Sequence, residues 1–473
     1  MNRPATEFKE RIQRALDDPQ IRTNFRRAMD GLMAKRAAMF PDADELEQLR
    51  DLGAAVRRNA LARLPGLLEK LEANCQRNGI IVHWAESVAE ANAIVLDIVR
   101  KHGGKSVIKG KSMVSEEMEL NHHLEAHGIE ALESDLGEYI VQLAGETPSH
   151  IIMPAIHKNT RQIAELFVEK LDGVEFTEDA EALTAIARGL LRRKFLDADV
   201  GLSGVNFAVA ETGTLCLIEN EGNGRLTTTA PDVHVAVTGI EKVVETLDDI
   251  TPLLSLLPRS ATGQGITTYV NMISGPRKQG ERDGPREVHL VLLDNGRTTS
   301  YVDPELRTTL QCIRCGACMN HCPVYARIGG HAYGTVYPGP IGEILSPQLL
   351  GCDEAGALPG ASTLCGACGE VCPVRIPIPK MLVRLRREAV TRDAASPVKD
   401  AGAQRSTSEA LIWKAWARIH AVPGLYSLVT RTASAFKKMP VVGPLKAWSS
   451  VRTPPRVAGR TLHQRMAARG STK

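Results

Sequence analysis

The sequence predicts an α/β domain with a substantially parallel sheet, followed by a cysteine-rich metal-binding domain and a helical basic tail. Between about residues 79 and 294, short apolar runs alternate with amphipathic stretches, a rhythm typical of parallel sheets covered by helices. Eight of the ten cysteines fall between residues 312 and 372. From residue 397 onward, six Lys and eight Arg face two acidic residues, a net charge of +12 that leaves −9 for the rest of the chain.

A chain of 473 residues is long enough for two or three domains. We expect a helical N-terminal arm or cap at 1–70, the α/β domain at 71–296, the cysteine-rich domain at 303–390 and the basic tail at 391–473. In the arm, charged and apolar residues recur at helical spacing, and Pro41 and Pro65 interrupt the pattern.

Within the α/β domain, apolar runs predict strands at 80–84, 106–110 and 150–155. Ser112 or Ser115 is placed to cap the helix that follows the second run, with Glu116 and Glu117 in its first turn. Residues 206–215 alternate and then turn, which predicts a hairpin. Cys75 and Cys216 stand alone and are expected to be buried as small apolar side chains.

Composition predicts that this is not an integral membrane protein, and the first residues do not favour a secreted one. Hydrophobic residues make up 43% and charged residues 24%, and no apolar run approaches the roughly 20 residues that a membrane span needs. The first 22 residues are charged throughout and lack the apolar core of a secretory signal. We therefore expect a cytoplasmic protein, in which clustered cysteines bind metal more often than they form disulfides.

The strongest motif is CIRCGACMNHCP at 312–323. Three thiolates at intervals of three can surround one [4Fe-4S] cluster, while the fourth, followed by proline, binds a second cluster. The shorter motif CGACGEVCP at 365–373 supplies the reciprocal half. By that exchange the first cluster is held by Cys312, Cys315, Cys318 and Cys372, and the second by Cys322, Cys365 and Cys368. The competing interpretation, structural zinc, accounts poorly for seven cysteines in this double pattern.

The second cluster is one cysteine short. Three residues before Cys365, where a full repeat would have its first cysteine, the chain has Ser362. Three outcomes remain open: Ser362 or another oxygen ligand, Cys352 from the preceding loop, or an iron left open or completed by a partner. An open or non-cysteine site is the preferred interpretation. Between the motifs, His331, Tyr333 and Tyr337 lie in a segment rich in glycine and proline and are expected to pack around the cofactor rather than to catalyse.

Together, the run CIRCGACMNHCPVYARIGGHAYGTVYPGPIG and the later LCGACGEVCPVRIPIP resemble the lactate utilization protein B family. Segments at 109–158 and 199–244 are similar to the amino-terminal domain of that family. The resemblance covers nearly the whole chain, and the last 60 or so residues match weakly. Cys352 does not belong to the family motif, which makes it a less expected ligand.

The resemblance implies a NagB/RpiA-like α/β fold of the LUD type, followed by an all-α ferredoxin-like dicluster domain. It implies two [4Fe-4S] clusters and a role as the electron-transfer subunit of a multi-protein system that oxidises L-lactate to pyruvate. The expected partners are the A-type and C-type lactate utilization proteins. The alternative function is a regulatory module whose cluster senses redox state or a metabolite.

Outside the cysteines the functional signals are weaker. Lys109 and Lys111 could bind a carboxylate or phosphate, although a capped surface helix with solvated lysines is the simpler interpretation. Several polar residues near the expected hairpin could lie at the edge of a pocket, although their role in turns explains them equally well. They are Glu211, Thr212, Thr214, Glu219, Asn220 and Asn223. No dinucleotide fingerprint and no acid-base set is present, so the catalytic residues are unknown and a self-contained dehydrogenase is not expected.

The tail carries a helical stripe of Leu411, Ile412, Trp416 and Ile419 among basic residues. Such a helix can dock on a partner protein or contact an anionic membrane surface, and a partner groove is preferred because Pro423 interrupts the pattern. Nucleic acid is not an expected partner, because no recognition motif accompanies the charge.

Overall fold

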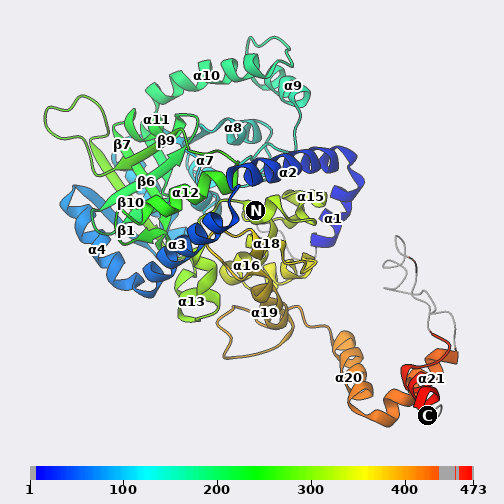
Figure 1. The fold of residues 1–473 in the computed structure, drawn as a ribbon. Helices are drawn as coiled ribbons and strands as arrows, with labels where there is room; N and C mark the ends of the chain where they lie inside the picture. The colour runs from blue at the N-terminus through cyan, green and yellow to red at the C-terminus, as the bar shows by residue number, and fades with distance from the viewer. Residues whose placement is uncertain (1–6, 436–452, 454–457, 471–473) are drawn as a thin grey trace. The chain divides into compact units, whose positions relative to one another are not determined.

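The computed structural model describes residues 7–435, 453 and 458–470. The chain divides into two compact units, residues 1–404 and residues 405–473. The first unit contains both sheets and all of the cysteines. Figure 1 follows the chain from the blue N-terminal helices through the green strands to the yellow cysteine-rich helices.

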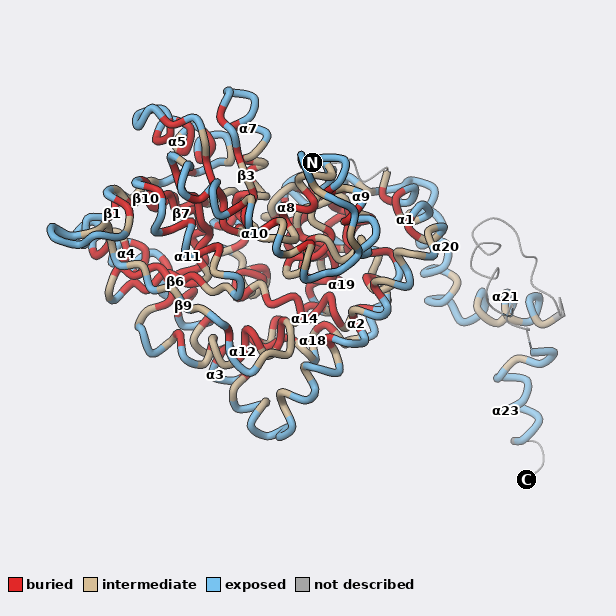
Figure 2. The backbone as a smooth tube through the Cα atoms, turned by 90° about the horizontal axis from the view of Figure 1, so that it is seen from above, coloured by how far each residue is buried: buried red, intermediate tan, exposed pale blue. Residues whose placement is uncertain are grey.

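A six-stranded sheet lies at the centre of the α/β region, and every neighbouring pair of its strands is parallel. This confirms the expected α/β class with a parallel sheet. In spatial order the strands are β1 (Ile80–Ala85), β10 (Glu287–Leu293), β7 (Val233–Gly239), β4 (Val200–Gly204), β2 (Ser106–Lys109) and β3 (Glu130–Glu133). The middle strands are buried along almost their whole length (Figure 2), as expected for a parallel sheet covered on both faces.

Helices connect and cover the strands. The side chain of Ser112 accepts a hydrogen bond from the backbone N–H of Ser115, so Ser112 caps its helix as expected. The helices of this region are α5 (Val88–Lys101), α6 (Met113–Glu117), α7 (Leu120–Ala126), α8 (Leu136–Leu143), α9 (Thr160–Lys170), α10 (Ala180–Asp197), α11 (Asn223–Thr229), η2 (Ile240–Lys242) and α12 (Ile250–Ala261).

A second, four-stranded sheet contains the predicted hairpin. Its strands are, in order, β8 (Val243–Val244), β5 (Phe207–Val209), β6 (Thr214–Glu219) and β9 (Tyr269–Ile273). β5 and β6 pair antiparallel, and the turn between them contains Gly213 at φ +68°. Because Gly213 meets the backbone of Asn74 and Cys75, a side chain at this position has no space.

Residues 150–155 are not a strand, contrary to the expectation from their apolar run. They form a loop in which the Nδ1 atom of His150 accepts hydrogen bonds from the backbone N–H groups of Ile152 and Met153, at 3.0 and 3.2 Å. These amides are therefore not available to a neighbouring strand. The other ring nitrogen of His150 is 2.9 Å from Asn320 Oδ1, which ties the loop to the first cysteine motif.

The N-terminal helices are α1 (Phe8–Asp17), α2 (Pro19–Met39), α3 (Ala43–Ala62) and α4 (Leu64–Arg77). They do not extend away from the molecule. The buried rings of Phe8 and Phe25 share one hydrophobic core with residues of the cysteine-rich segment and with Leu253 of α12. α4 packs on β1. The N-terminal helices therefore pack against both the α/β region and the cysteine-rich region and connect the two.

Between 297 and 390, the structure contains short helices and no strand. They are α13 (Arg297–Val302), η3 (Leu306–Gln311), α14 (Ala317–Asn320), α15 (Tyr325–Ile328), η4 (His331–Tyr333), α16 (Gly339–Leu350), α17 (Cys352–Ala355), η5 (Leu358–Ala361), α18 (Ala367–Glu370) and α19 (Ile378–Val390). Tyr333 and Tyr337 of the intervening segment are buried, as expected for packing residues.

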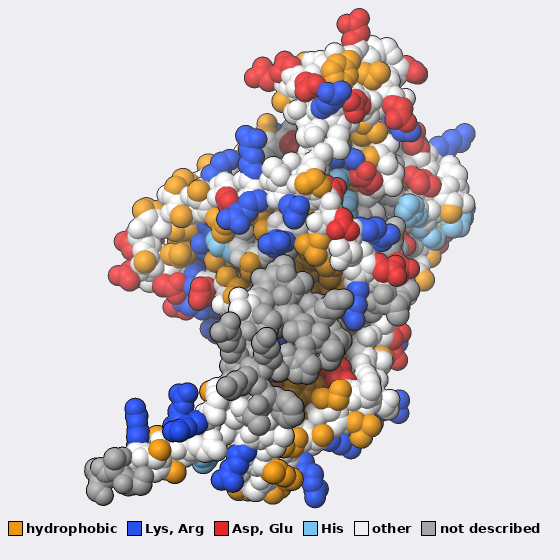
Figure 3. Space-filling view, turned by 90° about the vertical axis from the view of Figure 1, so that its right-hand side faces the viewer, with side chains coloured by type: hydrophobic (Ala, Val, Ile, Leu, Met, Phe, Trp, Pro, Cys, Tyr) orange, Lys and Arg blue, Asp and Glu red, His pale blue; other side chains and the backbone are white. Residues whose placement is uncertain are grey.

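The second unit contains α20 (Thr407–Ala421), α21 (Pro423–Ala435) and α23 (Leu462–Gly470). No residue of α20 is buried, and the side chains of Leu411, Ile412 and Trp416 are all more than half exposed. Figure 3 shows Lys and Arg side chains beside hydrophobic ones on the surface of the described tail helices. Within the described part of the chain, none of the helices combines the length and the hydropathy that crossing a membrane requires.

Candidate metal centre

The first cysteine motif is a tight turn followed by one turn of helix. η3 ends at Gln311, and two residues in the left-handed region, Arg314 at φ +61° and Gly316 at φ +75°, fold the backbone around the cysteines. The backbone N–H of Arg314 donates to Cys312 Sγ at 3.4 Å, and that of Ala317 donates to Cys315. N–H groups that point at cysteine sulfurs stabilise thiolates and tune the potential of a bound cluster.

The last cysteine of each motif is followed by proline and receives hydrogen bonds from the residues beyond it. The N–H of Tyr325 donates to Cys322 Sγ at 3.4 Å, and the N–H of Ile376 donates to Cys372 Sγ at 3.3 Å. In each case the valine two residues after the cysteine, Val324 or Val374, also donates. In both motifs, therefore, two backbone N–H groups point at the sulfur of the final cysteine.

The cysteines influence one another in two groups. Burial is the main reason that the pKa of Cys315 is raised, and the neighbouring Cys312 and Cys372 raise it further. Burial also raises the pKa of Cys368 to about 12, with further contributions from Cys322 and Cys365. The first group thus draws one cysteine from the second motif, and the second group draws one from the first.

The two groups adjoin at Cys318. Burial raises the pKa of Cys318 well above its usual value, with contributions from Cys315, Cys312 and Cys372 and a smaller one from Cys368 of the other group. Thiols that are this strongly buried, and whose thiolates would repel one another, stay protonated unless a cation compensates the negative charge. The buried cysteines of the two motifs therefore fit a positively charged metal group that is held by thiolates.

The spacing of the sulfurs argues against a single zinc ion. Four thiolates around zinc lie about 3.8 Å apart, from a Zn–S bond of about 2.3 Å in a tetrahedron. Among the described residues, the sets of three or more potential ligands whose donor atoms all lie within 4.8 Å contain no cysteine.

Basic side chains from distant parts of the chain hold the carbonyl groups of the motifs. Arg50 Nε donates to the carbonyl of Cys372 at 3.0 Å, and Lys242 Nζ donates to that of Cys312 at 3.1 Å. Arg36 and Arg57 donate to the carbonyls of Val371 and Gln311, respectively. Sequence reasoning missed these residues, because three of them lie in the N-terminal helices with no motif to mark them. The three arginines place positive charge beside a group that is negative when its ligands are thiolates, whereas burial lowers the pKa of Lys242 to about 7.

A buried ion-pair network lies behind the first motif. Arg297 donates to Glu117 at 2.9 Å and to Glu241 at 2.7 Å, and all three side chains are less than a tenth exposed. Burial alone would raise the pKa of Glu241, but Arg297, Lys242 and Arg314 lower it to about 2. Because Arg314 is a residue of the motif, the network couples the position of the motif to the sheet.

The two cysteines outside the motif pattern in the α/β region are buried, as expected. Cys75 and Cys216 are fully buried, and burial raises the pKa of each thiol to about 12. Cys352 is also fully buried, and burial together with Glu388, Asp353 and Asp400 raises its pKa to about 11. No other cysteine contributes to that shift, so Cys352 lies in an acidic environment of its own.

A cavity of about 340 Å³ opens beside the first motif at the carboxyl ends of the parallel strands. This is the edge at which open α/β sheets bind ligands. Its lining includes Ile313 and Arg314 of the motif, and also Lys111, Glu219, Asn220 and Asn223. Of the other candidates, Glu211, Thr212 and Thr214 do not line it. A molecule in this cavity would lie next to the first cysteine group.

Lys109 fits neither of the two interpretations offered for it. Its side chain is fully buried rather than solvated, and Nζ lies 2.6 Å from Glu133 and 3.4 Å from Glu116. Burial would lower its pKa, but these carboxylates raise it. Lys109 therefore neutralises a buried acidic group instead of binding a ligand.

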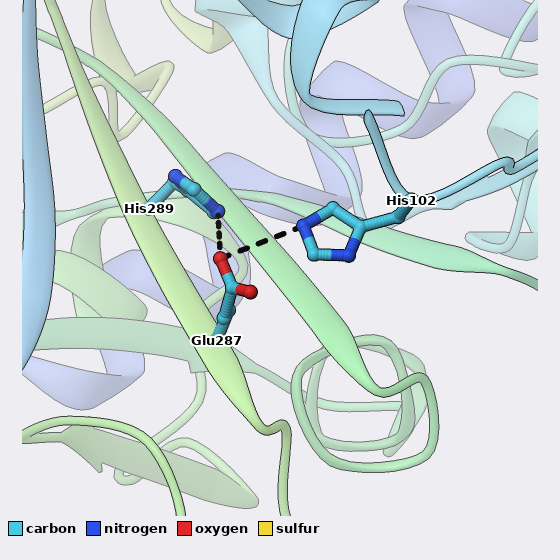
Figure 4. Close-up of side chains that lie close together, drawn as sticks. All are labelled: His102, Glu287 and His289. Carbon is cyan, nitrogen blue, oxygen red and sulfur yellow. Dashed lines mark ion pairs between the residues drawn. The ribbon is translucent and has the colours of Figure 1, made fainter. Parts of the chain in front are cut away.

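A second polar group lies at the opposite edge of the six-stranded sheet, where β10 begins. The Nε2 atoms of His289 and His102 approach one carboxylate oxygen of Glu287, at 3.4 and 3.5 Å (Figure 4). The other ring nitrogen of His289 is 3.0 Å from His83 Nε2. Lys101 shares the same carboxylate at 3.9 Å. This group is separate from the cysteines and was not anticipated from the sequence.

In a comparison with known proteins, three family models match successive regions of the chain. The model for the LUD domain matches residues 68–293, the model for the 4Fe-4S dicluster domain matches residues 308–376, and the model described as lactate utilisation protein B, C-terminal, matches residues 384–471. Proteins named lactate utilization protein B are similar over most of their length. Those of Bacillus licheniformis and Bacillus subtilis strain 168 are 42% and 41% identical over 454 and 456 residues, which cover 94% of this chain and 93% and 92% of theirs. That of Bacillus pumilus is 42% identical and covers 95% of both chains.

The chain belongs to the lactate utilization protein B family. The resemblance inferred from the cysteine motifs is therefore confirmed, and the residues that carry those motifs match the family model for the 4Fe-4S dicluster domain. The tail matches the family better than the sequence suggested, because the C-terminal family model extends through residue 471. Among solved structures, a DUF162 family protein from Deinococcus radiodurans is 14% identical, with a TM-score of 0.29, and the match covers 49% of this chain and 98% of that one.

Proposed function

We propose that this member of the lactate utilization protein B family carries two [4Fe-4S] clusters and transfers electrons within a multi-protein system that oxidises L-lactate to pyruvate. The observation that carries the proposal is the pair of cysteine motifs, which share one pattern of backbone hydrogen bonds and match the family model for the 4Fe-4S dicluster domain. Cys312, Cys315, Cys318 and Cys372 surround the first cluster, and Cys322, Cys365 and Cys368 contribute to the second. Their mutual effects on pKa support this division.

Bound clusters supply one-electron redox chemistry, so the two electrons from one lactate are passed on in separate steps. The chain contributes the surroundings. Buried side chains exclude water from Cys315, Cys318 and Cys372, which are all less than a tenth exposed. Arg50 adds positive charge beside the first group, and Lys242 donates a hydrogen bond to the carbonyl of Cys312. The influence of Cys368 on Cys318 supports a short path between the two groups.

Access to the second group supports a role in exchange with another protein. Cys365 is exposed, whereas Cys322 and Cys368 are buried. Electrons tunnel efficiently only over short distances, so a carrier needs one redox group near its surface. We infer that the second group faces the partners, which are the A-type and C-type lactate utilization proteins. The tail, with its exposed apolar stripe and its net positive charge, is a further docking element, either for these proteins or for an anionic membrane surface.

The deciding experiment combines metal analysis with reconstitution. Anaerobically purified protein should contain about eight iron and about eight sulfide per chain, as two [4Fe-4S] clusters require. Its EPR signals should appear on addition of L-lactate when the A-type and C-type proteins are present, and not when they are absent. Cys322→Ala should lose one cluster, whereas Cys216→Ala, a buried cysteine outside the motifs, should keep both. Zinc without sulfide would contradict the proposal.

A second candidate function follows from the same exposed residue. Because Cys365 is open to solvent, a cluster at this position can be oxidised or lose iron, and the protein can act as a redox or metabolite sensor instead of a carrier. In that case the reconstituted system would leave the clusters oxidised when L-lactate is added. Reduction of the clusters by L-lactate at the rate of pyruvate formation would exclude the sensor.

A further inference from the structure

The two cysteine motifs repeat one backbone fold at an offset of 50 residues. In the first, the N–H groups of Met319 and Asn320 donate to the carbonyl of Gly316, at 2.9 and 3.1 Å. In the second, the N–H groups of Gly369 and Glu370 donate to the carbonyl of Gly366, at 2.9 and 3.2 Å. The hydrogen bonds of the following two residues repeat in the same way. The second motif is therefore a structural copy of the first.

The copy extends to the position where the second motif lacks a cysteine. Cys312 follows the 3₁₀ helix η3 and has φ −58° and ψ 125°. Ser362 follows the 3₁₀ helix η5 and has φ −65° and ψ 139°. Two residues later, Arg314 and Leu364 both adopt the left-handed conformation, at φ +61° and +57°. A left-handed leucine is strained, so the turn is held by its surroundings and not by local preference.

The side chain of Ser362 takes the place of the missing thiol. The backbone N–H of Leu364 donates to Ser362 Oγ at 3.2 Å, just as the N–H of Arg314 donates to Cys312 Sγ at 3.4 Å. A basic side chain also fixes the carbonyl group at each position. Arg386 donates to the carbonyl of Ser362 at 2.6 Å, in the way that Lys242 does at Cys312. The hydroxyl therefore faces the same side of the turn as a cluster ligand.

The thiol of Cys352, the alternative fourth ligand, is not placed to occupy the position of Ser362. Cys352 is fully buried in α17, its backbone N–H donates to the carbonyl of Lys399, and its carbonyl accepts from Gln404. The charges that act on its thiol come from carboxylates and not from the second cysteine group. Moving Cys352 to the motif would require α17 to leave this packing.

We propose that Ser362 is the fourth protein ligand of the second cluster and binds through Oγ. This inference rests on the proposed two-cluster function. On binding, the Oγ–H bond breaks and an Oγ–Fe bond forms, while the proton leaves to water, because the neighbouring Thr363 and Cys365 are exposed. The N–H of Leu364 then stabilises the alkoxide, as an N–H stabilises a thiolate in the first motif.

The test compares Ser362→Ala, Ser362→Cys and the neighbouring control Thr363→Ala, each purified anaerobically as the full chain. In Ser362→Ala, at least one iron should be lost from about eight per chain, with the EPR signal of an oxidised three-iron cluster. In Ser362→Cys, all the iron should remain, but the midpoint potential of one cluster should shift while the other stays unchanged. Thr363→Ala should match the wild type in both measurements.

Two outcomes would overturn the proposal, and they differ in what else they affect. If both Ser362 variants match Thr363→Ala in iron content and in both midpoint potentials, Ser362 is not a ligand, and the two-cluster carrier is unaffected. If the wild type itself holds only about four iron per chain, the second cluster is absent, and the carrier function fails together with the ligand. Because Ser362→Cys preserves the shape of the turn, the comparison holds even if Ser362→Ala is unstable.

Discussion

Arg50 of α3 donates a hydrogen bond from Nε to the backbone carbonyl of Cys372, at 3.0 Å, across 322 residues of sequence. Its side chain is 7% exposed, and its Nη2 atom also donates to the carbonyl of Gly369. A fixed guanidinium in a buried position stabilises the addition of an electron to a group held by neighbouring thiolates. A side chain of the N-terminal helices therefore holds the backbone of the second cysteine motif directly, although the two segments are far apart in the sequence.

Replacing Arg50 by Met should lower the midpoint potential of one cluster. Loss of one partly compensated positive charge near the first group corresponds to roughly 1 kcal/mol, or roughly 40 mV for one electron. A redox titration followed by EPR measures both potentials separately. Arg58→Met is the matched control, because Arg58 lies on the same helix and is exposed. Equal shifts in the two variants would mean that the position of Arg50 has no special effect.

Substitution of Cys372 should affect the same cluster as substitution of Cys312, although the two residues are 60 positions apart in the sequence. In EPR spectra of the reduced protein, Cys372→Ala and Cys312→Ala should lose the same signal, and Cys365→Ala should lose the other. Cys352→Ala should keep both, because this buried thiol is surrounded by carboxylates. If Cys372→Ala and Cys365→Ala removed the same signal, each motif would hold its own cluster and the crossed grouping would be wrong.

Replacing Arg297 by Met should destabilise the compact unit strongly. The substitution removes the cation that pairs with the buried Glu117 and one of the cations beside the buried Glu241, which costs about 3–5 kcal/mol of the free energy of unfolding. The change is measured as a lower midpoint of denaturant unfolding. Lys194→Met is the control, since its pair with Glu130 is about half exposed and contributes roughly 0–1 kcal/mol. Similar midpoints for the two variants would show that the buried network is not important for stability.

The buried histidine His234 should make the protein less stable in mild acid. It lies in β7, with Ser203 of β4 at 2.8 Å and His289 of β10 nearby. Burial, with a contribution from His289, lowers the pKa of His234 to about 3. Below pH 6.5 the unfolded chain takes up a proton that the folded chain does not bind until the pH nears 3. The free energy of unfolding therefore falls as the pH falls through this range.

The test compares wild type and His234→Gln at pH 7 and pH 5. Between these values the wild type should lose about 2 kcal/mol more free energy of unfolding than the variant, from the difference between the two pKa values of one histidine. His127→Gln should behave like the wild type, because His127 is exposed. Parallel losses in wild type and His234→Gln would show that His234 is not the residue responsible.

The sequence predicted the elements whose patterns are local. The parallel strands β1 and β2, the cap at Ser112 and the hairpin at 206–215 each follow from a few neighbouring residues. The loop at 150–155 did not follow, because its conformation depends on His150 accepting backbone N–H groups and on contact with Asn320, far away in the sequence. An apolar run alone cannot report such a contact.

The candidate site divides in the same way. Seven cysteines were identified by their spacing, which is a property of the sequence itself. Arg50, Arg57 and Lys242 were not, because long basic side chains are common on helices and nothing marks those that turn inward. The equivalence of Ser362 and Cys312 was suggested by spacing, but it needed the backbone angles to become a specific inference.

The core that joins Phe8 and Phe25 to Leu385 has a consequence for synthesis. During translation, α1 and α2 leave the ribosome first, but the surface that they cover is completed only when α19 has been made. Contacts between such distant residues form late in folding, because a long loop must close first. Until then the cysteine motifs are not covered by the N-terminal helices. The order of translation thus leaves an interval in which the cysteines can bind metal before the N-terminal helices pack over them.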